Sequence, residues 1–576
     1  MKMALQSFCI YVLLLLGAGT GALGQAHTDS VAVSDTIILN PASIERLALF
    51  GQVWGFLKYH HAAVASGRID FDQEFLRILP LVVSAGSDSG FSSVVEKWLL
   101  ALGPMEICRR CDVKINAEVT LLPDYGDLFS NSVFSASLVQ RLAFIRDNTN
   151  NKSNHYISLK PAKNPSFDHE ITYNSQAYPN AGLRLLGLMR YWNMVQYFSP
   201  NRELVARPWG QVLREFIPQM VLAGDKKGYA FAVARLISTT RDTHAFIGSQ
   251  VFSTSRGKWI TPFAAIFVGD TLVVTSNYTD SSGTQVLVRA GDVVVAVNGV
   301  TTADLVKHFL PIVSASNMAS AKRDLPIYHL LRSDSALMQL EVGRNGKVLE
   351  ITQRLIPYNV RFHTERFTGT VGQQGYEILQ DSYMYIRSSK FHKKDYEKMR
   401  KQISGLKGII VDLRCYPSDN LIPTLINDLK SKPSPFVKLS YPVVARPGLF
   451  VSKVNFAGGG GKIGEDLPVV VLVNEVTQSH AEYVAMAFAQ VKNATVIGSQ
   501  TSGADGNISI LNFPGGIYSN ISGLGVYYPE GKSAQGAGVK IDVQVSPTIE
   551  GIRDGRDEVL EKAMEILNSW KKRTAK

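Results

Sequence analysis

The sequence predicts a multidomain α/β protein, and three observations lead to this fold class. Two similar helical segments occupy the first half of the 576 residues, short β patterns follow them, and strands alternate with helices after about residue 375. Hydrophobic residues make up 45% of the chain and charged residues 19%, which is the composition of a globular protein and not of a disordered one. At roughly 150 residues per domain, this length predicts three or four domains.

Residues 1–24 are expected to be a secretory signal peptide. One lysine precedes an apolar run from Phe8 to Leu16, and small residues lead to a cut after Gly24. The run is too short to span a bilayer, which takes roughly 20 apolar residues, and no later segment is long enough either. We therefore expect an exported protein, periplasmic or secreted, whose mature chain is not inserted in a membrane.

Residues 25–182 and 183–254 are predicted to be two copies of one helical module. The stretch RLALFGQVWGFLKYHH aligns with RLLGLMRYWNMVQYFS, so that Trp54 matches Trp192 at an offset of 138 residues. Both stretches have apolar residues at helical spacing, which predicts that their aromatic side chains pack in a helix core. The first copy also carries a polar, turn-rich insert that contains RDNTNNKSNH.

Residues 255–357 are predicted to form a separate β domain. Apolar runs such as FAAIFVGDTLVVTSNY alternate with turns, and the Arg-Asn-Gly-Lys sequence at 344–347 is typical of a hairpin turn. The stretch RAGDVVVAVNGV, from Arg289 to Val300, resembles the xxGDxIxxVNGxxV stretch of PDZ domains. A helical TTADLVKHF follows where that fold has a helix, so we expect a PDZ-like domain here.

Residues 358–576 are predicted to form an α/β domain with a mainly parallel sheet. YMYIRS, GIIVDL, PVVVLV and ATVIGS have the apolar character of buried strands, and the helical segments KDYEKMRKQI, NLIPTLINDL and AEYVAMAFAQV separate them. This order is typical of βαβ units, whose strands are parallel. An amphipathic helix closes the domain, with Val559, Ala563 and Ile566 on one face.

Ser479 is the first candidate for chemistry, in the stretch TQSHAEY that follows PVVVLV. Open α/β sheets bind ligands beyond the carboxyl ends of their strands, and a helix that starts there presents free N–H groups to a developing oxyanion. The alternative is that Ser479 only caps the helix, with Glu482 completing a capping box. His480 cannot easily act as the base for its neighbour, because adjacent residues at a helix start point about 100° apart. Its backbone N–H can still face an oxyanion.

Several ordered motifs carry a family resemblance: GIIVDLRCYPSDN, VNEVTQSHAEY, VIGSQTSGADGN and GAGVKIDVQVSPTIEGIRDGRDEVLEKA, preceded by the PDZ-like stretch. Together they resemble the tail-specific, or C-terminal processing, serine peptidase family over roughly Leu183 to Leu567. The resemblance implies that Ser479 is the nucleophile, because the family's serine stands three residues before a glutamate. One branch of the family uses a lysine 25 residues after the serine as general base, but Ala504 occupies that position here.

The tricorn-like branch is the better match. It has a helical module ending in a histidine, then a PDZ domain, then the module with the serine, and His244 in RDTHAFIGS matches that histidine. The resemblance therefore implies that His244 is the general base, and an unperturbed imidazole pKa near 6.5 suits that role. The branch's orienting glutamate maps near Gln535, which could hydrogen-bond the imidazole but carries no charge. Asp242, Asp505 and Glu482 are other candidates for the orienting residue.

The oxyanion hole is expected to combine two backbone N–H groups. The resemblance implies that one belongs to His480 and the other to Ser418, in the loop DLRCYPSDN. Ser418 and Asp419 stand where the family's DLRxNPGG loop has glycines, and a Cβ restricts backbone conformations that glycine permits.

Together with the resemblance, these observations predict an exported serine endopeptidase acting on proteins or peptides. The resemblance also implies that the PDZ-like domain captures the substrate C-terminus. Trimming of short peptides, hydrolysis of non-peptide esters and peptide binding by a catalytically inactive homologue are alternatives. No motif predicts a cofactor or a metal site, and no basic stripe predicts nucleic-acid binding. Cys108 and Cys111, in CRRC, are expected to form a disulfide or to remain free thiols.

Overall fold

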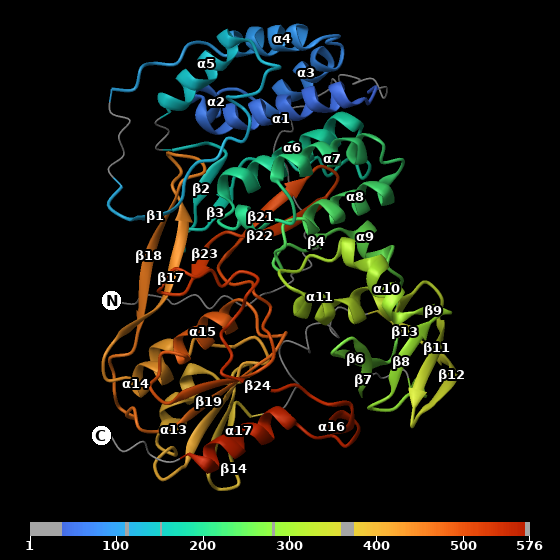
Figure 1. The fold of residues 1–576 in the computed structure, drawn as a ribbon, viewed down its shortest axis with the longest axis vertical. Coiled ribbons are helices and arrows are strands. Elements are labelled where there is room, and N and C mark those ends of the chain that lie inside the picture. The colour runs from blue at the N-terminus through green and yellow to red at the C-terminus, as the bar shows by residue number, and fades with distance from the viewer. Residues whose placement is uncertain (1–36, 110–114, 150–152, 279–282, 359–373, 571–576) are drawn as a thin grey trace, which may run out of the picture. The chain divides into compact units, whose positions relative to one another are not determined.

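The computed structural model of the chain (Figure 1) describes residues 37–109, 115–149, 153–278, 283–358 and 374–570. All of them belong to one unit, Val33–Lys576. The expected signal peptide lies outside the described residues, as does Cys111. Cys108 is disulfide-bonded, so of its two expected states the structure has the oxidised one. Within the described ranges, no helix is both long and apolar enough to cross a membrane.

Helices build the N-terminal part of the described chain. They are α1 (Pro41–His60), α2 (Ala62–Ala65), α3 (Phe71–Val83), α4 (Asp88–Ala101), α5 (Ala136–Asp147), α6 (Ala181–Phe198), α7 (Trp209–Val221), α8 (Lys226–Ser238) and α9 (Gln250–Thr254). One continuous apolar core runs through them, so the two predicted segments do not have separate cores. The aligned tryptophans make equivalent hydrogen bonds: the indole of Trp54 donates to the carbonyl of Phe71 and that of Trp192 to the carbonyl of Trp209, both at 2.8 Å.

A cluster of four charged side chains is buried inside this core. Nζ of Lys58 lies 2.6 Å from Oε1 of Glu170, and Nε of Arg190 lies 3.0 Å from Oε2 of Glu170. Arg190 is also ion-paired with Asp72, whose pKa is held below its usual value by the two cations despite burial. Two positive charges therefore face two negative ones, and no member of the cluster is buried without a partner.

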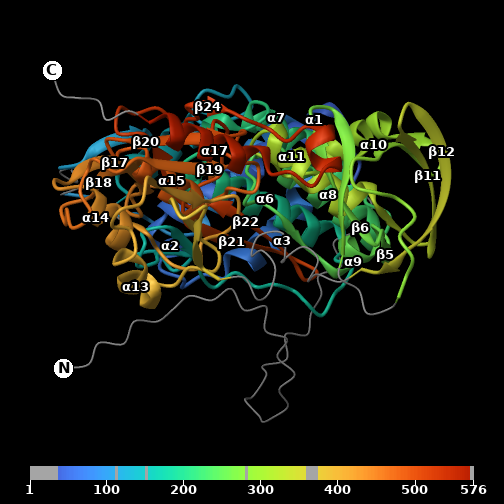
Figure 2. The same cartoon turned by 90° about the horizontal axis from the view of Figure 1, so that it is seen from below.

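An antiparallel β domain follows. Its main sheet has the order β12-β11-β8-β7-β6, with β9 paired to β8, and a small sheet has the order β10-β5-β13. The predicted hairpin is confirmed, because Arg344 pairs with Lys347 and the two residues between them both have positive φ. Figure 1 shows β11 and β12 as two neighbouring strands of the β domain, and they lie side by side in Figure 2 as well. The elements are β5 (Trp259–Ile260), β6 (Phe263–Val268), β7 (Thr271–Asn277), β8 (Val293–Val297), β9 (Val300–Thr301), α10 (Thr302–Phe309), α11 (Met318–Leu325), β10 (Arg332–Ser333), β11 (Leu337–Arg344), β12 (Lys347–Arg354) and β13 (Ile356–Pro357).

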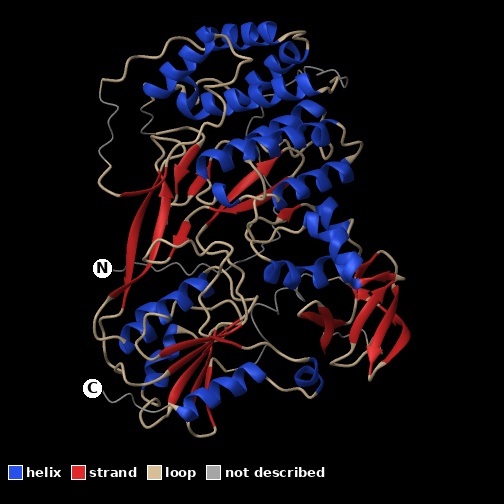
Figure 3. Ribbon diagram, viewed as in Figure 1, coloured by secondary structure: helices blue, strands red, loops and turns tan. Residues whose placement is uncertain are grey.

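The C-terminal part contains the predicted mainly parallel sheet, with helices on both faces (Figure 3). Its order is β14-β15-β16-β19-β20-β24, and every pair except β14 with β15 is parallel. Successive strand residues face opposite cores: Ile409 packs in the core that contains α15, and Ile410 packs against α17. The elements are β14 (Tyr376–Leu379), β15 (Tyr383–Arg387), α13 (Tyr396–Arg400), β16 (Gly408–Asp412), α14 (Asn427–Leu429), β19 (Val469–Val473), α15 (His480–Phe488), β20 (Ala494–Gly498), β24 (Val543–Gln544), α16 (Ile549–Arg553) and α17 (Glu558–Ser569).

Two hairpins of the C-terminal part pair with strands from the N-terminal half. The first is β17 (Ser434–Pro442) with β18 (Phe450–Ala457), which joins a sheet with β1 (Glu118–Leu121) and β23 (Gly525–Tyr527). The second is β21 (Ile508–Phe513) with β22 (Ile517–Ser522), which pairs with β4 (Ile247–Gly248), and Phe513 packs in the helical core. The pairing of β4 with β22 brings the segment after α8 next to residues that follow it by 270 or 272 positions, a contact that no local pattern predicted.

Candidate active site

Ser479 stands at the turn between strand β19 and helix α15, at the carboxyl end of the parallel sheet. Its backbone has φ 57° and ψ −122°, a conformation that residues with a Cβ rarely adopt and that costs about 1–3 kcal/mol. The N–H of Ser479 donates to the carbonyl of Ala504 at 2.9 Å. The strained turn is therefore held by hydrogen bonds to a loop that follows β20.

Glu482 fixes that loop to the start of α15. Its buried carboxylate accepts hydrogen bonds from the N–H groups of Gly503 at 2.8 Å and Ala504 at 3.0 Å, from Thr501 Oγ1 at 2.5 Å and from the N–H of Ser479 at 3.3 Å. Burial raises the pKa of Glu482, and the four donors oppose that shift. The carboxylate of Glu482 is thus bonded to the loop and to the helix start, as in a capping box.

His244 lies in the turn after α8 and is buried. Its Nδ1 is 2.9 Å from Oγ of Ser522, which in turn lies 3.0 Å from Oδ1 of Asp242. Asp242 also accepts from the backbone N–H groups of Ser522 at 2.6 Å and His244 at 3.0 Å, and its Oδ1 is 3.8 Å from the imidazole Nδ1. Asp242 and Ser522 thus form a chain of contacts that ends at Nδ1 of His244.

The contacts of Ser522 assign the tautomer of His244. A serine hydroxyl has one hydrogen, and the carboxylate of Asp242 can only accept it. The oxygen of Ser522 is then left to accept from Nδ1–H of His244, which places the lone pair of the ring on Nε2. Burial lowers the pKa of His244 below its usual 6.5, Asp242 opposes that shift and Arg323 adds to it, so the ring is neutral near pH 7.

One loop touches the segments of both Ser479 and His244. Thr243 Oγ1, beside His244, lies 3.3 Å from the carbonyl of Ser502, and Ala504 in the same loop accepts from the N–H of Ser479. Arg323 of helix α11 supports the arrangement from the β domain, because its Nη1 donates to Ser502 Oγ at 2.6 Å and to Gln478 Oε1 at 2.7 Å. The loop from Thr501 to Ala504 therefore joins the two predicted catalytic segments.

Gln535 lies away from the position expected for an orienting residue. Its amide donates to Ser316 Oγ at 3.1 Å and to the carbonyl of Arg241 at 3.4 Å. The imidazole nitrogen that it was expected to reach is already bonded to Ser522. Sequence reasoning named Asp242 as one of several candidates but missed Ser522, which has no local signal because it lies 278 residues after His244.

The two expected oxyanion donors differ in their surroundings. His480 is the first residue of α15, so its N–H has no acceptor within the helix. The N–H of Ser418, in contrast, donates to the carbonyl of Ser388 at 2.9 Å, and the Ser418 hydroxyl donates to Phe391 at 2.5 Å. The amide of Ser418 is thus occupied, because its loop folds back on the turn after β15.

Two further polar groups surround Ser479. The ring of Tyr416 lies 6.4 Å from the ring of His480, the residue after Ser479. The side chain of Asp505 is buried, and its Oδ2 has no hydrogen-bond partner among the described residues. Burial, reinforced by Glu482, raises the pKa of Asp505 well above its usual value.

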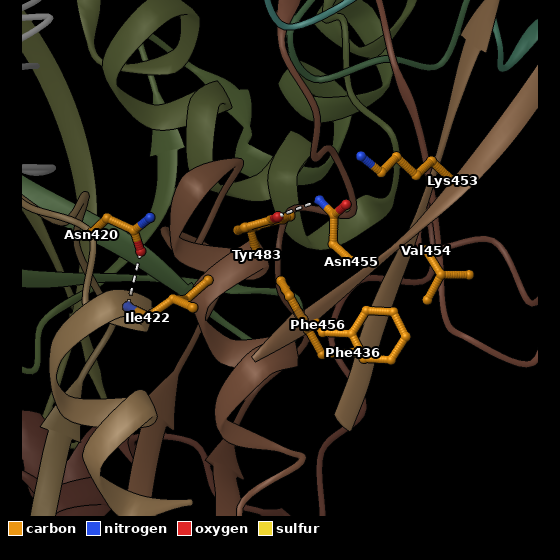
Figure 4. A pocket seen from close by; sticks show the side chains of 8 residues that line it. All are labelled: Asn420, Ile422, Phe436, Lys453, Val454, Asn455, Phe456 and Tyr483. Carbon is orange, nitrogen blue, oxygen red and sulfur yellow. Dashed lines mark hydrogen bonds between the residues drawn. The ribbon is translucent and has the colours of Figure 1, made fainter. Parts of the chain in front are cut away.

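A cavity of about 350 Å³ opens beside the first turns of α15 (Figure 4). Apolar side chains and polar ends share its wall, and Asn455 donates to the hydroxyl of Tyr483 at 3.0 Å. The lining residues are Asn420, Ile422, Phe436, Lys453, Val454, Asn455, Phe456 and Tyr483. Across the described part of the chain, no group of three His, Cys, Asp or Glu side chains is placed to hold a metal ion.

Comparison with known proteins finds the same peptidase family that the sequence motifs resemble. Residues 382–545 match the model of peptidase family S41. A carboxy-terminal-processing protease of Bartonella bacilliformis (strain ATCC 35685 / KC583 / Herrer 020/F12,63) is 25% identical over 185 residues, which cover 31% of this chain and 42% of that protein. The chain therefore matches less than half the length of this relative.

Two solved structures of mature CPAF have a fold similar to that of this chain. Mature CPAF is 15% identical with a TM-score of 0.52, over 69% of this chain and 99% of that one. Mature CPAF complexed with lactacystin is 14% identical with a TM-score of 0.52, over 67% and 98%. At these identities the likeness concerns the fold alone. Taken with the family match, it confirms the resemblance seen in the motifs: the chain contains a peptidase family S41 domain, which spans residues 382–545 and includes Ser479.

Proposed function

We propose that this protein is a serine-type peptidase that hydrolyses peptide bonds in proteins or peptides, with Ser479 as the nucleophile. The observation that carries the proposal is the strained backbone of Ser479 at a strand-to-helix turn. A sharp turn of this kind lifts a serine hydroxyl out of the sheet and beside the free N–H groups of the following helix, the arrangement used by many serine hydrolases. A serine that served only as a helix cap would not need a positive φ, because caps normally have extended backbone.

His244 is proposed as the general base. The assigned tautomer leaves Nε2 able to take the proton of the Ser479 hydroxyl, and the lowered pKa keeps the ring neutral near pH 7. The shared loop from Thr501 to Ala504 supports the pairing, since it contacts both segments. Asp242 is proposed as the orienting residue in place of Gln535, acting through Ser522, and its negative charge stabilises the imidazolium that forms.

The proposed reaction follows acyl-transfer chemistry. Oγ of Ser479 attacks the carbonyl carbon of the scissile bond while its proton moves to Nε2 of His244, and the carbonyl oxygen gains the negative charge. The N–H of His480 donates to that oxygen. The imidazolium then protonates the amine nitrogen as the C–N bond breaks, which leaves the acyl group as an ester on Ser479. Water attacks this ester while His244 takes its proton, and His244 returns that proton to the oxygen of Ser479 as the acid product leaves. The cavity beside Tyr483 offers space for an apolar side chain of the substrate.

The β domain of residues 255–357 is proposed to be PDZ-like and to capture the C-terminus of the substrate. The motif from Arg289 to Val300, the antiparallel sheet and helix α10 directly after β9 support this proposal. A peptide that adds to an outer strand of a sheet gains main-chain hydrogen bonds, and β6 and β12 are the outer strands here. Export by a cleaved signal peptide remains part of the proposal, supported by the apolar run from Phe8 to Leu16.

The duplication of the helical module is likewise a proposal. The equivalent hydrogen bonds of Trp54 and Trp192 support it, because each indole donates to the residue 17 positions after it. Both acceptors are the first residues of the next long helix, α3 and α7. A chance similarity of two buried apolar helices is not expected to reproduce this contact.

Labelling with a fluorophosphonate probe tests the proposed function, because the probe reacts only with an activated serine. We expect the folded wild type to be labelled and to cleave a peptide library, and Ser479→Ala to do neither. Labelling that persists in Ser479→Ala would assign the reactivity to another residue. Peptide binding without cleavage or labelling by the wild type would favour the alternative of an inactive binding homologue.

A further inference from the structure

The three-stranded sheet of β21, β22 and β4 has one face in the helical core and one face toward solvent. Leu511 and Ile521 project from the first face and pack in the core. Side chains alternate along a strand, so the residues at even positions, among them Ile508, Ile510 and Tyr518, project from the other face. They are 39%, 47% and 43% exposed. Large apolar side chains are therefore left uncovered on the face that points away from the core.

These apolar side chains form one continuous patch. Ile508 and Ile510 are neighbours on one side of β21, and Tyr518 lies diagonally across from Ile510, because Ile510 pairs with Asn520. The ring of Phe246, which is 48% exposed, lies 5.8 Å from the ring of Tyr518 in an edge-to-face contact. We call Phe246, Ile508, Ile510 and Tyr518 the apolar face. Exposed apolar patches of this kind mark interaction sites on proteins.

Gly248 makes room for the ring of Tyr518. The two residues are paired across β4 and β22, and a Cβ on Gly248 would lie 2.2 Å from the ring. The ring therefore rests against the backbone of β4 at a residue without a side chain and still exposes part of its surface. An aromatic side chain that is already held in place loses little conformational entropy when a partner covers it.

The apolar face and His244 lie on the same side of this sheet. Ser522 pairs with Ile508, and directly opposed residues of an antiparallel pair project from the same face. The hydroxyl of Ser522 is the group that contacts Nδ1 of His244 at 2.9 Å, so the imidazole lies over that face. Phe246 follows His244 by two residues in the chain. The apolar face therefore begins beside the proposed general base.

The proposed reaction decides which part of a substrate passes this face. His244 protonates the amine nitrogen of the scissile bond, so that nitrogen must come within roughly 2.6–3.2 Å of Nε2. The substrate residues that follow this nitrogen therefore start beside His244, where the apolar face begins. Strands β21, β22 and β4 contain no charged residue, so the face matches apolar side chains and offers no ion pair to a charged one.

We propose that the apolar face binds the substrate on the leaving-group side of the scissile bond and selects peptides with large apolar residues there. This inference rests on the proposed function and adds a substrate preference to it. No bond forms or breaks at the face, and its contribution is the apolar surface that the substrate covers. The face acts until the amine leaves with its peptide and takes no part in the release of the acyl group by water.

Two quenched fluorogenic peptides test the inference. Both derive from a peptide that the wild type cleaves, and they differ only at the second to fourth residues after the scissile bond, Leu-Phe-Leu in one and Ser-Gln-Ser in the other. We expect the wild type to cleave the apolar peptide with at least about tenfold higher kcat/KM. Ile510→Ser should lower this ratio about threefold to tenfold, and Ile510→Leu should keep it. The matched control is Ile378→Ser, because Ile378 is 39% exposed in β14, an outer strand of the parallel sheet.

The rate of fluorophosphonate labelling separates substrate binding from structural support of His244, because this probe carries no residue on the leaving-group side. We expect Ile510→Ser to be labelled at the wild-type rate. If the wild type cleaves both peptides equally well, if Ile510→Ser keeps the wild-type ratio, or if its labelling slows as well, the inference is wrong while the proposed function stands. An unchanged ratio with loss of a dimer in size-exclusion chromatography would assign the face to a second copy of the chain instead. A wild type that neither cleaves nor labels would overturn both proposals.

Discussion

The hydroxyl of Ser522 lies 2.9 Å from Nδ1 of His244, although 278 residues separate them in the chain. The same hydroxyl is 3.0 Å from the carboxylate of Asp242, so the acid and the imidazole are connected through a serine. A direct carboxylate contact is 3.8 Å long and therefore weaker. This relationship identifies the group that sets the tautomer of the proposed base, and the first two predictions depend on it.

The pH dependence of peptide cleavage should report the lowered pKa of His244. Burial is the main cause of the shift, with Asp242 opposing it and Arg323 adding to it. Because the base must be neutral, activity is present above the folded pKa and lost as the pH falls through it. We expect the acid limb of kcat/KM to have its midpoint below 6.5. A midpoint above 6.5 would contradict the assignment of His244 as base.

Asp242→Asn should lower kcat and move that limb to still lower pH. The carboxylate raises the pKa of His244, so its removal lowers the pKa further, and the imidazolium loses its stabilising charge. Ser522→Ala should also lower kcat, because Nδ1 loses its acceptor. A control is Asp270→Asn, whose side chain is 97% exposed and ion-paired with Lys322 in the β domain. Equal pH profiles for Asp242→Asn and the control would refute the role of Asp242.

Gly503→Ala should disrupt the loop that joins the two catalytic segments. Gly503 has φ +63°, and a Cβ there would lie 2.7 Å from the backbone of Gly536. Gly405 has φ +87° with no atom within 4 Å of a Cβ, so Gly405→Ala meets the backbone strain alone, about 1–2 kcal/mol. We expect Gly503→Ala to lose at least about tenfold in kcat/KM and more stability than the control, measured by urea unfolding. Similar losses in the two variants would show that the loop tolerates displacement.

The buried charge cluster should dominate the stability of the helical part. Arg190→Met leaves Asp72 and Glu170 with one cation, Lys58, and should lower the free energy of unfolding by about 3–5 kcal/mol. Arg77→Ala removes a pair with Glu74 in which the arginine is 54% exposed, and should cost about 0–1 kcal/mol. Chemical denaturation of both variants measures the difference. A loss below about 1 kcal/mol for Arg190→Met would mean that water or a neighbouring group compensates the two carboxylates.

Local patterns predicted much of the fold. The order of buried strands and helices after residue 375 gave the parallel sheet, because a strand covered on both faces must be apolar throughout. The Asn-Gly pair gave the hairpin between β11 and β12, because both residues tolerate positive φ. The predicted helix over 420–429 is mostly a π turn, Ile422–Ile426, followed by the short helix α14. Pro423 lies in that turn and cannot donate a backbone hydrogen bond.

By itself the sequence determined the alternation of strands and helices after residue 375, the strand-to-helix turn at Ser479 and the motifs around it, because each depends on residues that are neighbours in the chain. Only the tertiary structure decided that Ser522 stands behind His244, that Gln535 points elsewhere and that the amide of Ser418 is occupied. These contacts come from the pairing of β4 with β22 and from the folding of one loop onto another. Such pairings are set by the packing of the whole core, and no periodicity within a single segment encodes them.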